Sequence, residues 1–346
     1  EELAVAGIVD KFEEEGLKVF GPHMAPAMLE GSKAIAKEFM KKYKVKTAAY
    51  ETFDDYEKAK AYVEAGEFPV VIKASGLAAG KGVIIAQNLT EAVDALKEIM
   101  LDKKFGDSGN EVVIEEFLEG VEASILSIYD GEKILPFVSA KDHKKIGEKE
   151  TGLNTGGMGV IAPNPYVTEE VNKAFYDDIL NPTLEGLKAE YKAFAGIIFF
   201  GLMINKRGVY LLEYNMRLGD PETQVVLSLM ESDLLTLIEK AMDGKMTESD
   251  LVWAKKAACC VVVAAGGYPE EYKKGDLITG LESVENNVFM AGVKKDDGFR
   301  TNGGRVLNVV ALGNNLEDAR KNAYSDVDKI KFEGAYVRRD IGVLYE

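Results

Sequence analysis

The sequence predicts a protein of several domains that combines α/β and α+β architecture. Its 346 residues correspond to about two or three domains of typical size. Strand and helix patterns alternate between residues 48 and 118, and short strands and turns with one helix follow Ala254. We therefore expect four parts: residues 1–30 as the remnant of an N-terminal α/β domain, 31–47 with 119–253 as the core, 48–118 as a small α/β subdomain, and 254–346 as a C-terminal α+β domain.

The composition excludes several classes of function. The chain is 47% hydrophobic and 29% charged, with a formal net charge of −16, which disfavours nucleic acid and anionic membranes as partners. It contains neither a run of about 20 apolar residues nor a signal peptide, so we expect a cytoplasmic protein. Cys259 and Cys260 are adjacent, so a disulfide bond between them would be strained, and we expect two small buried side chains. His23 and His143 are the only histidines, so no zinc-type spacing exists.

The chain opens with a helical pattern, a short strand candidate at Leu17–Phe20 and a Gly-Pro stop. One helix and one strand cannot close a core, so residues 1–22 are expected to be the tail of a domain whose beginning is absent here. A second helix is expected over residues 29–45. Ser32 is its N-cap candidate, and one helical face carries Ile35, Phe39, Met40 and Tyr43.

Hydrophobic periodicity and turn residues predict the remaining elements. An Asp-Gly turn at residues 130–131 joins a pair of strands, and a hairpin of two long strands is expected over residues 195–215. The other strands are expected at 47–53, 69–74, 82–86, 111–118, 122–131, 133–143, 258–269, 286–292 and 303–313, and the other helices at 54–66, 90–101, from about Thr168, around 221–242 and at 316–330.

A glycine-rich loop with two nearby lysines separates the strands at 69–74 and 82–86. Only three residues lie between Gly76 and Gly80, Gly82 stands where a P-loop has Ser or Thr, and a strand follows instead of a helix, so the segment is not a P-loop. A strand, a glycine loop and a second strand describe a hairpin flap whose backbone N–H groups can cover phosphates. A plain glycine hairpin with Lys73 and Lys81 in solvent is the alternative.

Two lysines point to a nearby anion. Lys73 interrupts an apolar strand next to Val71, and a buried lysine needs an anionic partner. Lys33 lies in the first turn of its helix, where a cation opposes the helix dipole. Surface lysines that extend into solvent are the alternative for both positions.

The segment VYLLEYNMRLGDPETQ concentrates functional side chains after a buried apolar run. Glu213 and Asn215 are two residues apart on a strand, so they share one face. Carboxylate and amide oxygens suit a hard cation such as Mg²⁺, with water and substrate phosphates as its other ligands. Arg217, Asp220 and Glu222 follow in the next turn. An exposed strand end with paired surface charges is the alternative.

Two further segments supply polar groups. In TGLNTGGMG, the side chains of Asn154 and Thr155 and the backbone of Gly156–Gly157 can hold an anion or a carboxylate. In KDHKK, His143 is a candidate base, although a histidine beside three lysines is more typical of a solvated residue.

Taken together, these segments resemble an ATP-grasp enzyme, and more closely the glycinamide ribonucleotide synthetase (phosphoribosylamine–glycine ligase) family. The resemblance covers nearly the whole chain and lacks most of the family's N-terminal domain. It is carried in order by LEGSKAIAKEFM, VVIKASGLAAGKGV, VIEEFLEGVEAS, KDHKK, TGLNTGGMG, GLMI, LLEYNMRLGDPETQ, GYP and GGRVLNVVALG.

The resemblance implies an ATP-grasp core in which residues 48–118 form the lid subdomain. It implies ligation of glycine to 5-phosphoribosylamine through a glycyl phosphate in de novo purine synthesis, with ATP and Mg²⁺ or Mn²⁺. By similarity, the ATP phosphates would be bound by Lys33, Lys73, Gly80, Lys81 and Gly82, the adenine by Glu115, Glu116, Phe117 and Leu118, and the ribose by Glu122. The metal would be held by Glu213 and Asn215, and the catalytic residues would be Arg217 and Asp142. The other substrates would be bound by Asn154, Thr155, Gly156, Gly157, Asp220 and Glu222.

Two other functions stay open from the sequence. One is another ATP-grasp ligase that joins a carboxylate to an amine, against which the KASGLAAGKG segment argues. The other is an ATP-binding fragment that lacks ligase activity because of the truncated start. We expect small-molecule substrates and a monomer.

Overall fold

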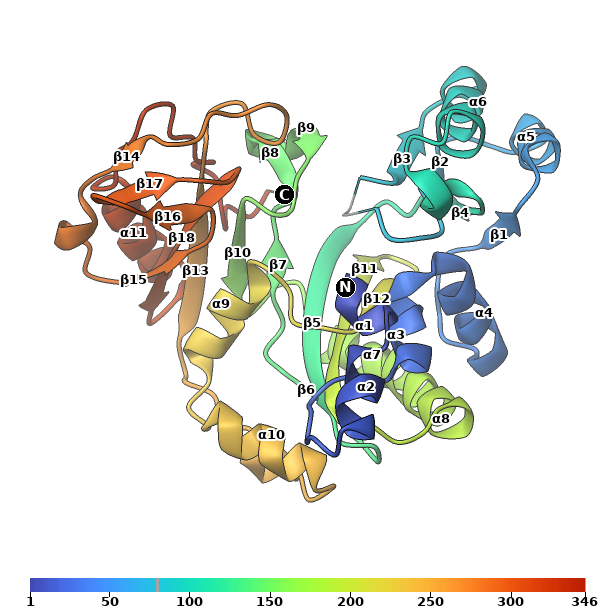
Figure 1. Ribbon diagram of the computed structural model, residues 1–346, viewed down its shortest axis with the longest axis horizontal. Coiled ribbons are helices and arrows are strands. Elements are labelled where there is room, and N and C mark those ends of the chain that lie inside the picture. The colour runs from blue at the N-terminus through green and yellow to red at the C-terminus, as the bar shows by residue number, and fades with distance from the viewer. Residues whose placement is uncertain (79–80, 346) are drawn as a thin grey trace. The chain divides into compact units, whose positions relative to one another are not determined.

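The computed structural model describes residues 1–78 and 81–345, so the predicted ATP-site residue Gly80 lies outside the described residues. The chain divides into two compact units (Figure 1). The first unit comprises Glu1–Pro136, Thr168–Leu218 and Leu234–Met246, and the second comprises Phe137–Val167, Gly219–Asp233 and Thr247–Glu346.

The first unit contains a small antiparallel sheet with the strand order β1-β4-β2-β3. Helices α5 and α6 pack on this sheet (Figure 1), and their alanines meet Ile72, Val112 and Ile114 in a buried core. These contacts give the small sheet and its two helices a buried core. The elements of this part are β1 (Tyr50–Phe53), α5 (Tyr56–Glu64), β2 (Val70–Ala74), β3 (Val83–Ala86), α6 (Leu89–Leu96), the π-helical turn Lys97–Leu101, the 3-10 turn Gly106–Gly109 and β4 (Val112–Glu116).

A second sheet of the first unit has the order β12-β11-β5-β6. Its central strand β11 carries the apolar run that the sequence predicts as half of a hairpin, and the pairing of β11 with β12 confirms that hairpin. The Asp-Gly turn between β5 and β6 is confirmed as well. The elements are β5 (Val121–Tyr129), β6 (Ile134–Pro136), α7 (Glu169–Phe175), the π-helical turn Tyr176–Leu180, α8 (Asn181–Glu190), β11 (Gly196–Asn205), β12 (Gly208–Asn215) and α10 (Leu234–Met242).

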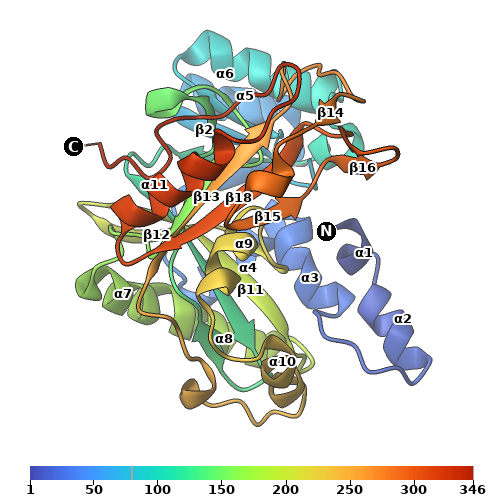
Figure 2. The same ribbon diagram turned by 90° about the vertical axis from the view of Figure 1, so that its left-hand side faces the viewer.

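The N-terminal helices of the first unit are α1 (Glu2–Val5), α2 (Ile8–Glu14), α3 (Met24–Gly31) and α4 (Lys33–Tyr43). The first three lie side by side (Figure 2). The predicted strand at Leu17–Phe20 is wrong, because these residues pair with no strand in the described part of the chain. Ser32 caps α4 as predicted, since its Oγ accepts a hydrogen bond from Ile35 N. Ile35 itself is exposed, whereas Phe39 and Met40 are buried.

The second unit is built on a five-stranded antiparallel sheet with the order β15-β18-β13-β10-β7. Helix α11 packs on β13 and β18 (Figure 1). Every residue of β13 is buried, so Cys259 and Cys260 are core side chains, as predicted, and both are free thiols. The main elements are β7 (Lys141–Asp142), β10 (Gly159–Ala162), α9 (Glu222–Val226), β13 (Ala257–Ala264), β15 (Asn287–Met290), β18 (Arg305–Gly313) and α11 (Leu316–Val327).

Shorter elements complete the second unit. A hairpin pairs β8 with β9, and a three-stranded sheet has the order β14-β17-β16. Three-residue 3-10 turns lie between these strands and helices. The elements are β8 (Lys145–Gly147), Glu148–Glu150, β9 (Thr151–Asn154), Leu227–Leu229, Glu248–Asp250, β14 (Leu277–Ile278), Leu281–Ser283, β16 (Val293–Lys295) and β17 (Phe299–Thr301).

Two predicted elements are each divided in the structure. The helix expected around residues 221–242 forms as α9 and α10, with extended backbone at Met230 between them. The strand expected over residues 133–143 forms as β6 and β7, which belong to different sheets. In both cases the apolar pattern continues across a change of unit, so hydrophobic periodicity alone does not reveal the break. Within the described ranges, no helix has the length and apolarity needed to cross a membrane.

Candidate functional site

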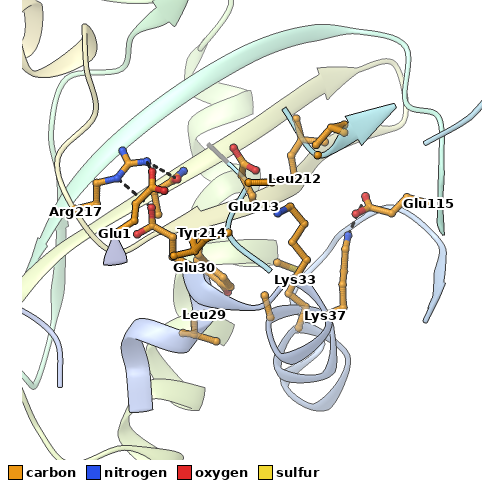
Figure 3. Close-up of a pocket in the computed structure, with 17 residues that line it drawn as sticks. Glu1, Leu29, Glu30, Lys33, Lys37, Glu115, Leu212, Glu213, Tyr214 and Arg217 are labelled. Atoms are coloured by element: carbon orange, nitrogen blue, oxygen red, sulfur yellow. Dashed lines mark hydrogen bonds and ion pairs between the residues drawn. The ribbon is translucent and has the colours of Figure 1, made fainter. Parts of the chain in front are cut away.

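The first unit contains a pocket between α3, α4, the glycine-rich loop, β4 and β12. Five residues predicted to bind ATP or a metal line it, namely Lys33, Gly82, Glu115, Glu213 and Asn215, together with the predicted catalytic residue Arg217 (Figure 3). The pocket is also lined by Glu1, Leu29, Glu30, Ala36, Lys37, Met40, Leu77, Ala78, Val83, Leu212 and Tyr214. Segments more than 100 residues apart in the sequence therefore meet in one pocket, which brings together some of the predicted residues.

Strand β12 presents the two predicted metal ligands on one face. Glu213, Tyr214 and Asn215 all line the pocket, but the Tyr214 side chain is buried and its hydroxyl group is bonded to Thr183 Oγ1 at 2.7 Å. This alternation follows from the period of two residues along a strand. In the described part of the chain, no group of three or more His, Cys, Asp or Glu side chains could hold a metal ion. A carboxylate and an amide oxygen in a pocket with room for phosphates fit Mg²⁺ or Mn²⁺, which keep several non-protein ligands.

Lys33 reaches from the first turn of α4 toward Glu213 (Figure 3). Its Nζ also lies 3.5 Å from Gly76 O in the glycine-rich loop. Burial lowers the pKa of Lys33, and the negative charge of Glu213 opposes that shift. The anion that the position of Lys33 predicts is therefore present as Glu213.

Glu115 on β4 is a buried carboxylate between two buried lysines. Its Oε1 lies 2.7 Å from Lys73 Nζ on β2, and its Oε2 lies 3.1 Å from Lys37 Nζ on α4. Burial raises the pKa of Glu115, but Lys73 and Lys37 together outweigh burial, so its pKa lies below the usual value. The buried anion predicted for Lys73 is thus Glu115, and this carboxylate joins the small sheet to α4.

Lys37 also contacts the strand that carries the predicted metal ligands. Its Nζ donates to Thr47 Oγ1 at 2.7 Å, and Thr47 Oγ1 in turn donates to Leu211 O on β12 at 2.6 Å. Burial lowers the pKa of Lys37 to about 8 in spite of Glu115. Lys37 follows Lys33 by four residues and so shares its helical face, a spacing that would have revealed it in the sequence.

The low pKa of Lys37 predicts a pH dependence of stability. Because its pKa falls from 10.5 to about 8 on folding, the unfolded chain binds more protons than the folded chain between these pH values. The free energy of unfolding contributed by Lys37 therefore rises with pH in this range. Urea unfolding of the wild type and of Lys37→Met at pH 7.5 and pH 10 should show a wild-type advantage that increases with pH. A difference that does not change with pH would contradict the assignment, and Lys41→Met on the exposed face of α4 is the control.

The glycine-rich loop leaves β2 and returns as β3, which pair as an antiparallel hairpin. This confirms the predicted strand–loop–strand arrangement and the exclusion of a P-loop. Lys33 N donates to Ser75 O at 2.8 Å, and Ala34 N donates to Ser75 Oγ at 3.2 Å, so the start of the loop is fixed to the N-terminus of α4. A Cβ atom at Gly82 would lie 2.8 Å from Ala78 Cβ. Lys81 is exposed and is not among the residues that line the pocket.

The other predicted ATP-site residues lie at the end of β4, directly after it, and at the start of β5. Glu116 forms an ion pair with Arg207 at 2.6 Å, so its carboxylate is directed to the surface. Leu118 is buried, whereas Phe117 and Glu122 are half-buried. None of these four side chains is among those that line the pocket.

The predicted catalytic residue Asp142 and the predicted substrate residues lie in the second unit. Asp142 is buried on β7, and a Cβ atom at Gly157 would lie 2.7 Å from its Oδ1. Gly157 also has a φ of +112°, so two independent constraints favour glycine there. Thr155 Oγ1 accepts from Gly157 N at 2.9 Å and donates to Lys144 O at 2.8 Å.

Arg305 joins two of these predicted substrate segments, and the sequence analysis missed it. Its Nη1 donates to Gly156 O at 2.6 Å and to Asp220 O at 2.8 Å, and its Nη2 donates to Asp220 Oδ2 at 3.0 Å. Glu222 is buried at the start of α9, whereas Asn154 is exposed on β9. The lone arginine that precedes the buried run of β18 was the only sequence signal for Arg305.

His143 corrects the expectation of a solvated side chain. It is buried, its Nδ1 donates to Gly159 O at 3.0 Å, and its Nε2 accepts from Gly342 N at 3.1 Å. Burial lowers its pKa to about 3, so it is neutral and bonded on both nitrogens. The two ring nitrogens therefore bind backbone groups of Gly159 and Gly342. The three lysines close to His143 in the sequence gave no indication that its side chain is buried.

Comparison with known proteins gives the family. The family described as phosphoribosylglycinamide synthetase matches over residues 31–223 with its ATP-grasp (A) domain and over residues 258–344 with its C domain. A phosphoribosylamine–glycine ligase of Fusobacterium nucleatum is 60% identical over 351 residues, which cover 100% of this chain and 82% of that protein. Its counterpart in Clostridium acetobutylicum is 56% identical and covers 98% of this chain and 82% of its own length.

Solved structures agree with this match. The crystal structure of phosphoribosylamine–glycine ligase from Thermotoga maritima has a TM-score of 0.88 at 38% identity and covers 94% of this chain and 82% of that one. A biotin carboxylase domain from Hydrogenobacter thermophilus, at 18% identity and a TM-score of 0.73 over 97% of this chain and 74% of that one, shows likeness of fold alone. These likenesses confirm the predicted ATP-grasp fold, and the chain belongs to the phosphoribosylamine–glycine ligase family of ATP-grasp enzymes.

Proposed function

We propose that this chain catalyses the ATP-dependent ligation of glycine to 5-phosphoribosylamine, which gives glycinamide ribonucleotide, ADP and phosphate in de novo purine synthesis. The observation that carries the proposal is the pocket that Lys33, Glu213 and Asn215 line together. Glu213 and Asn215 provide oxygen ligands for a metal ion, and Lys33 in the same pocket can bind phosphate. The 60% identity to a phosphoribosylamine–glycine ligase indicates which reaction this pocket would catalyse.

A carboxylate is a poor electrophile, and the proposed reaction overcomes this in two steps. An oxygen of the glycine carboxylate attacks the γ-phosphorus of ATP, ADP leaves, and glycyl phosphate forms. The amine of 5-phosphoribosylamine then attacks the acyl carbon, loses a proton, and expels phosphate as the amide bond forms. Charge that develops on the transferred phosphoryl group requires positive groups held in place beforehand.

Residues in and near the pocket divide these tasks. Lys33 and Lys73 bind ATP phosphates, and Arg217 stabilises charge at the reacting end of the pocket. Glu213 and Asn215 would hold Mg²⁺ or Mn²⁺, which neutralises phosphate charge when bound. The loop that includes Lys81 and Gly82 covers the phosphates and excludes water, which would otherwise hydrolyse glycyl phosphate. Residues 48–118 act as the lid subdomain, 31–47 with 119–253 as the core, and 254–346 as the C-terminal domain.

The remaining assignments are proposals from the same resemblance. The segment from Glu115 to Leu118 meets adenine, and Glu122 meets the ribose. Asp142 has a catalytic role of its own. Residues 154–157, Asp220 and Glu222 bind glycine and 5-phosphoribosylamine, and Arg305 holds the backbone of Gly156 and Asp220 in place for them. We further propose that the protein is a cytoplasmic monomer.

A turnover assay tests the proposal directly. We expect ADP release that requires ATP, Mg²⁺, glycine and 5-phosphoribosylamine together, and mass spectrometry should identify glycinamide ribonucleotide as the product. Titration calorimetry with ATP and Mg²⁺ measures binding separately from turnover. Binding of ATP without glycine-dependent turnover would contradict ligase activity and favour a nucleotide-binding role. Turnover with a different amine would favour another ligase of the ATP-grasp class.

A further inference from the structure

Glu30, which the sequence analysis did not single out, lies at the end of the pocket beside Arg217 (Figure 3). It is near the C-terminal end of α3, and its side chain is 7% exposed. Its two carboxylate oxygens have different partners on the segment after β12. Oε1 lies 3.0 Å from Arg217 Nε, and Oε2 accepts a hydrogen bond from Met216 N at 2.7 Å.

These two contacts fix both the backbone and the side chain that follow the predicted metal ligands. Met216 is the next residue after Asn215, so its N–H belongs to the peptide group that Asn215 begins. A carboxylate carries acceptors on both oxygens and no donor when ionised. Glu30 therefore meets two donors at once, which an amide of the same shape cannot do.

Arg217 extends this arrangement to Asn215. Its Nη2 donates to Asn215 Oδ1 at 3.2 Å, and its Nη1 donates to Leu218 O at 3.2 Å. A guanidinium group only donates hydrogen bonds, so the amide atom that faces Arg217 must be the oxygen. That oxygen has a second lone pair, which remains suited to a cation. Glu1 also forms an ion pair with Arg217, through Nη2, but Glu30 is the partner of Nε.

We infer that Glu30 is a positioning residue, which acts through Arg217 to hold the amide oxygen of Asn215 toward the bound cation. This inference rests on the proposed function, because it assigns Asn215 to the metal. Groups that orient metal ligands without touching the metal affect metal affinity by about 10–100-fold when they are changed. Burial raises the pKa of Glu30, and the charge of Arg217 opposes that shift, so the ion pair with Arg217 favours the ionised carboxylate.

The test measures Mn²⁺ affinity in addition to activity. Mn²⁺ binding to the full chain is followed by electron paramagnetic resonance in the presence of a non-hydrolysable ATP analogue. Glu30→Gln should weaken the Kd for Mn²⁺ by about 10-fold or more while Glu213 still supplies a ligand. Glu38→Gln, on the exposed side of α4, is the matched control and should bind Mn²⁺ as the wild type does.

A double-mutant cycle separates positioning from a general loss of structure. If Glu30 acts through Arg217, then Arg217→Met alone should weaken Mn²⁺ binding, and adding Glu30→Gln to it should change the Kd by less than about 2-fold. Circular dichroism establishes whether each variant is folded. Should Glu30→Gln fail to fold, Arg217→Met still decides, because Mn²⁺ affinity equal to that of the wild type would overturn the inference.

The outcomes also separate this inference from the function on which it rests. If the wild-type chain binds no Mn²⁺ together with the ATP analogue, the proposed function fails. If the wild type binds Mn²⁺ and folded Glu30→Gln binds it equally well, only the positioning role of Glu30 fails. Fully additive effects of Glu30→Gln and Arg217→Met would likewise overturn it.

Discussion

Replacing Glu213 by alanine is expected to lower kcat for glycinamide ribonucleotide formation by at least about 10²–10³-fold, the cost of removing one group that supports transition-state charge. Two causes contribute. Glu213 is the only carboxylate of the proposed metal pair with Asn215, and it also faces Lys33 in the pocket. Its loss therefore removes a proposed metal ligand and the carboxylate that acts most strongly on the charge of half-buried Lys33.

The measurement is ADP release at saturating ATP and glycine over a range of Mg²⁺ concentrations. A shift of the Mg²⁺ dependence to higher concentration would show that the metal site is weakened, whereas an unchanged dependence with lower kcat would point to Lys33 instead. Glu185→Ala, at an exposed position on α8 in the same unit, is the control. Full activity of Glu213→Ala would refute the metal assignment.

Replacing Glu115 by alanine is expected to destabilise the small sheet by about 3–5 kcal/mol, the typical cost of leaving a buried charge without its partner. Lys37 and Lys73 would lose the carboxylate that they share, and both are nearly inaccessible to solvent, with 2% and 8% of their side chains exposed. Native-state hydrogen exchange of the β2 and β4 amides measures this opening free energy locally.

The adjacent residue provides a matched control for Glu115. Glu116 also forms an ion pair, with Arg207, but 36% of the Glu116 side chain and 55% of the Arg207 side chain are exposed. Exposed ion pairs contribute little to stability, so Glu116→Ala should leave exchange of the same amides close to that of the wild type. Equal effects of the two substitutions would refute a special role for the buried carboxylate.

Local sequence patterns were sufficient for most of the secondary structure. The hairpin of β11 and β12, the cap at Ser32 and the strand–loop–strand form of the glycine-rich segment all depend on residues close together in the sequence. The same holds for the shared face of Glu213 and Asn215, because alternation along a strand is a local property. The resemblance of the motifs, in their order along the chain, also indicated the family.

Prediction failed where a residue's environment depends on distant segments. Leu17–Phe20 has an apolar, strand-like pattern, but a strand needs a partner, and among residues 1–78 and 81–345 no strand pairs with it. The helix expected around residues 221–242 is divided because its two halves pack into different units. His143 is buried through bonds to Gly159 and Gly342, and the second of these residues lies almost 200 positions away in the sequence.

The sequence by itself determined the family, the order of the elements and the face of β12 that carries the candidate metal ligands. Only the tertiary structure decided which charges meet: Glu115 lies between Lys37 and Lys73, and Glu30 holds Arg217. The physical reason is that helix and strand periods specify on which face a side chain lies, whereas ion pairs depend on distances between faces of different elements. Those distances are set by packing of the whole unit.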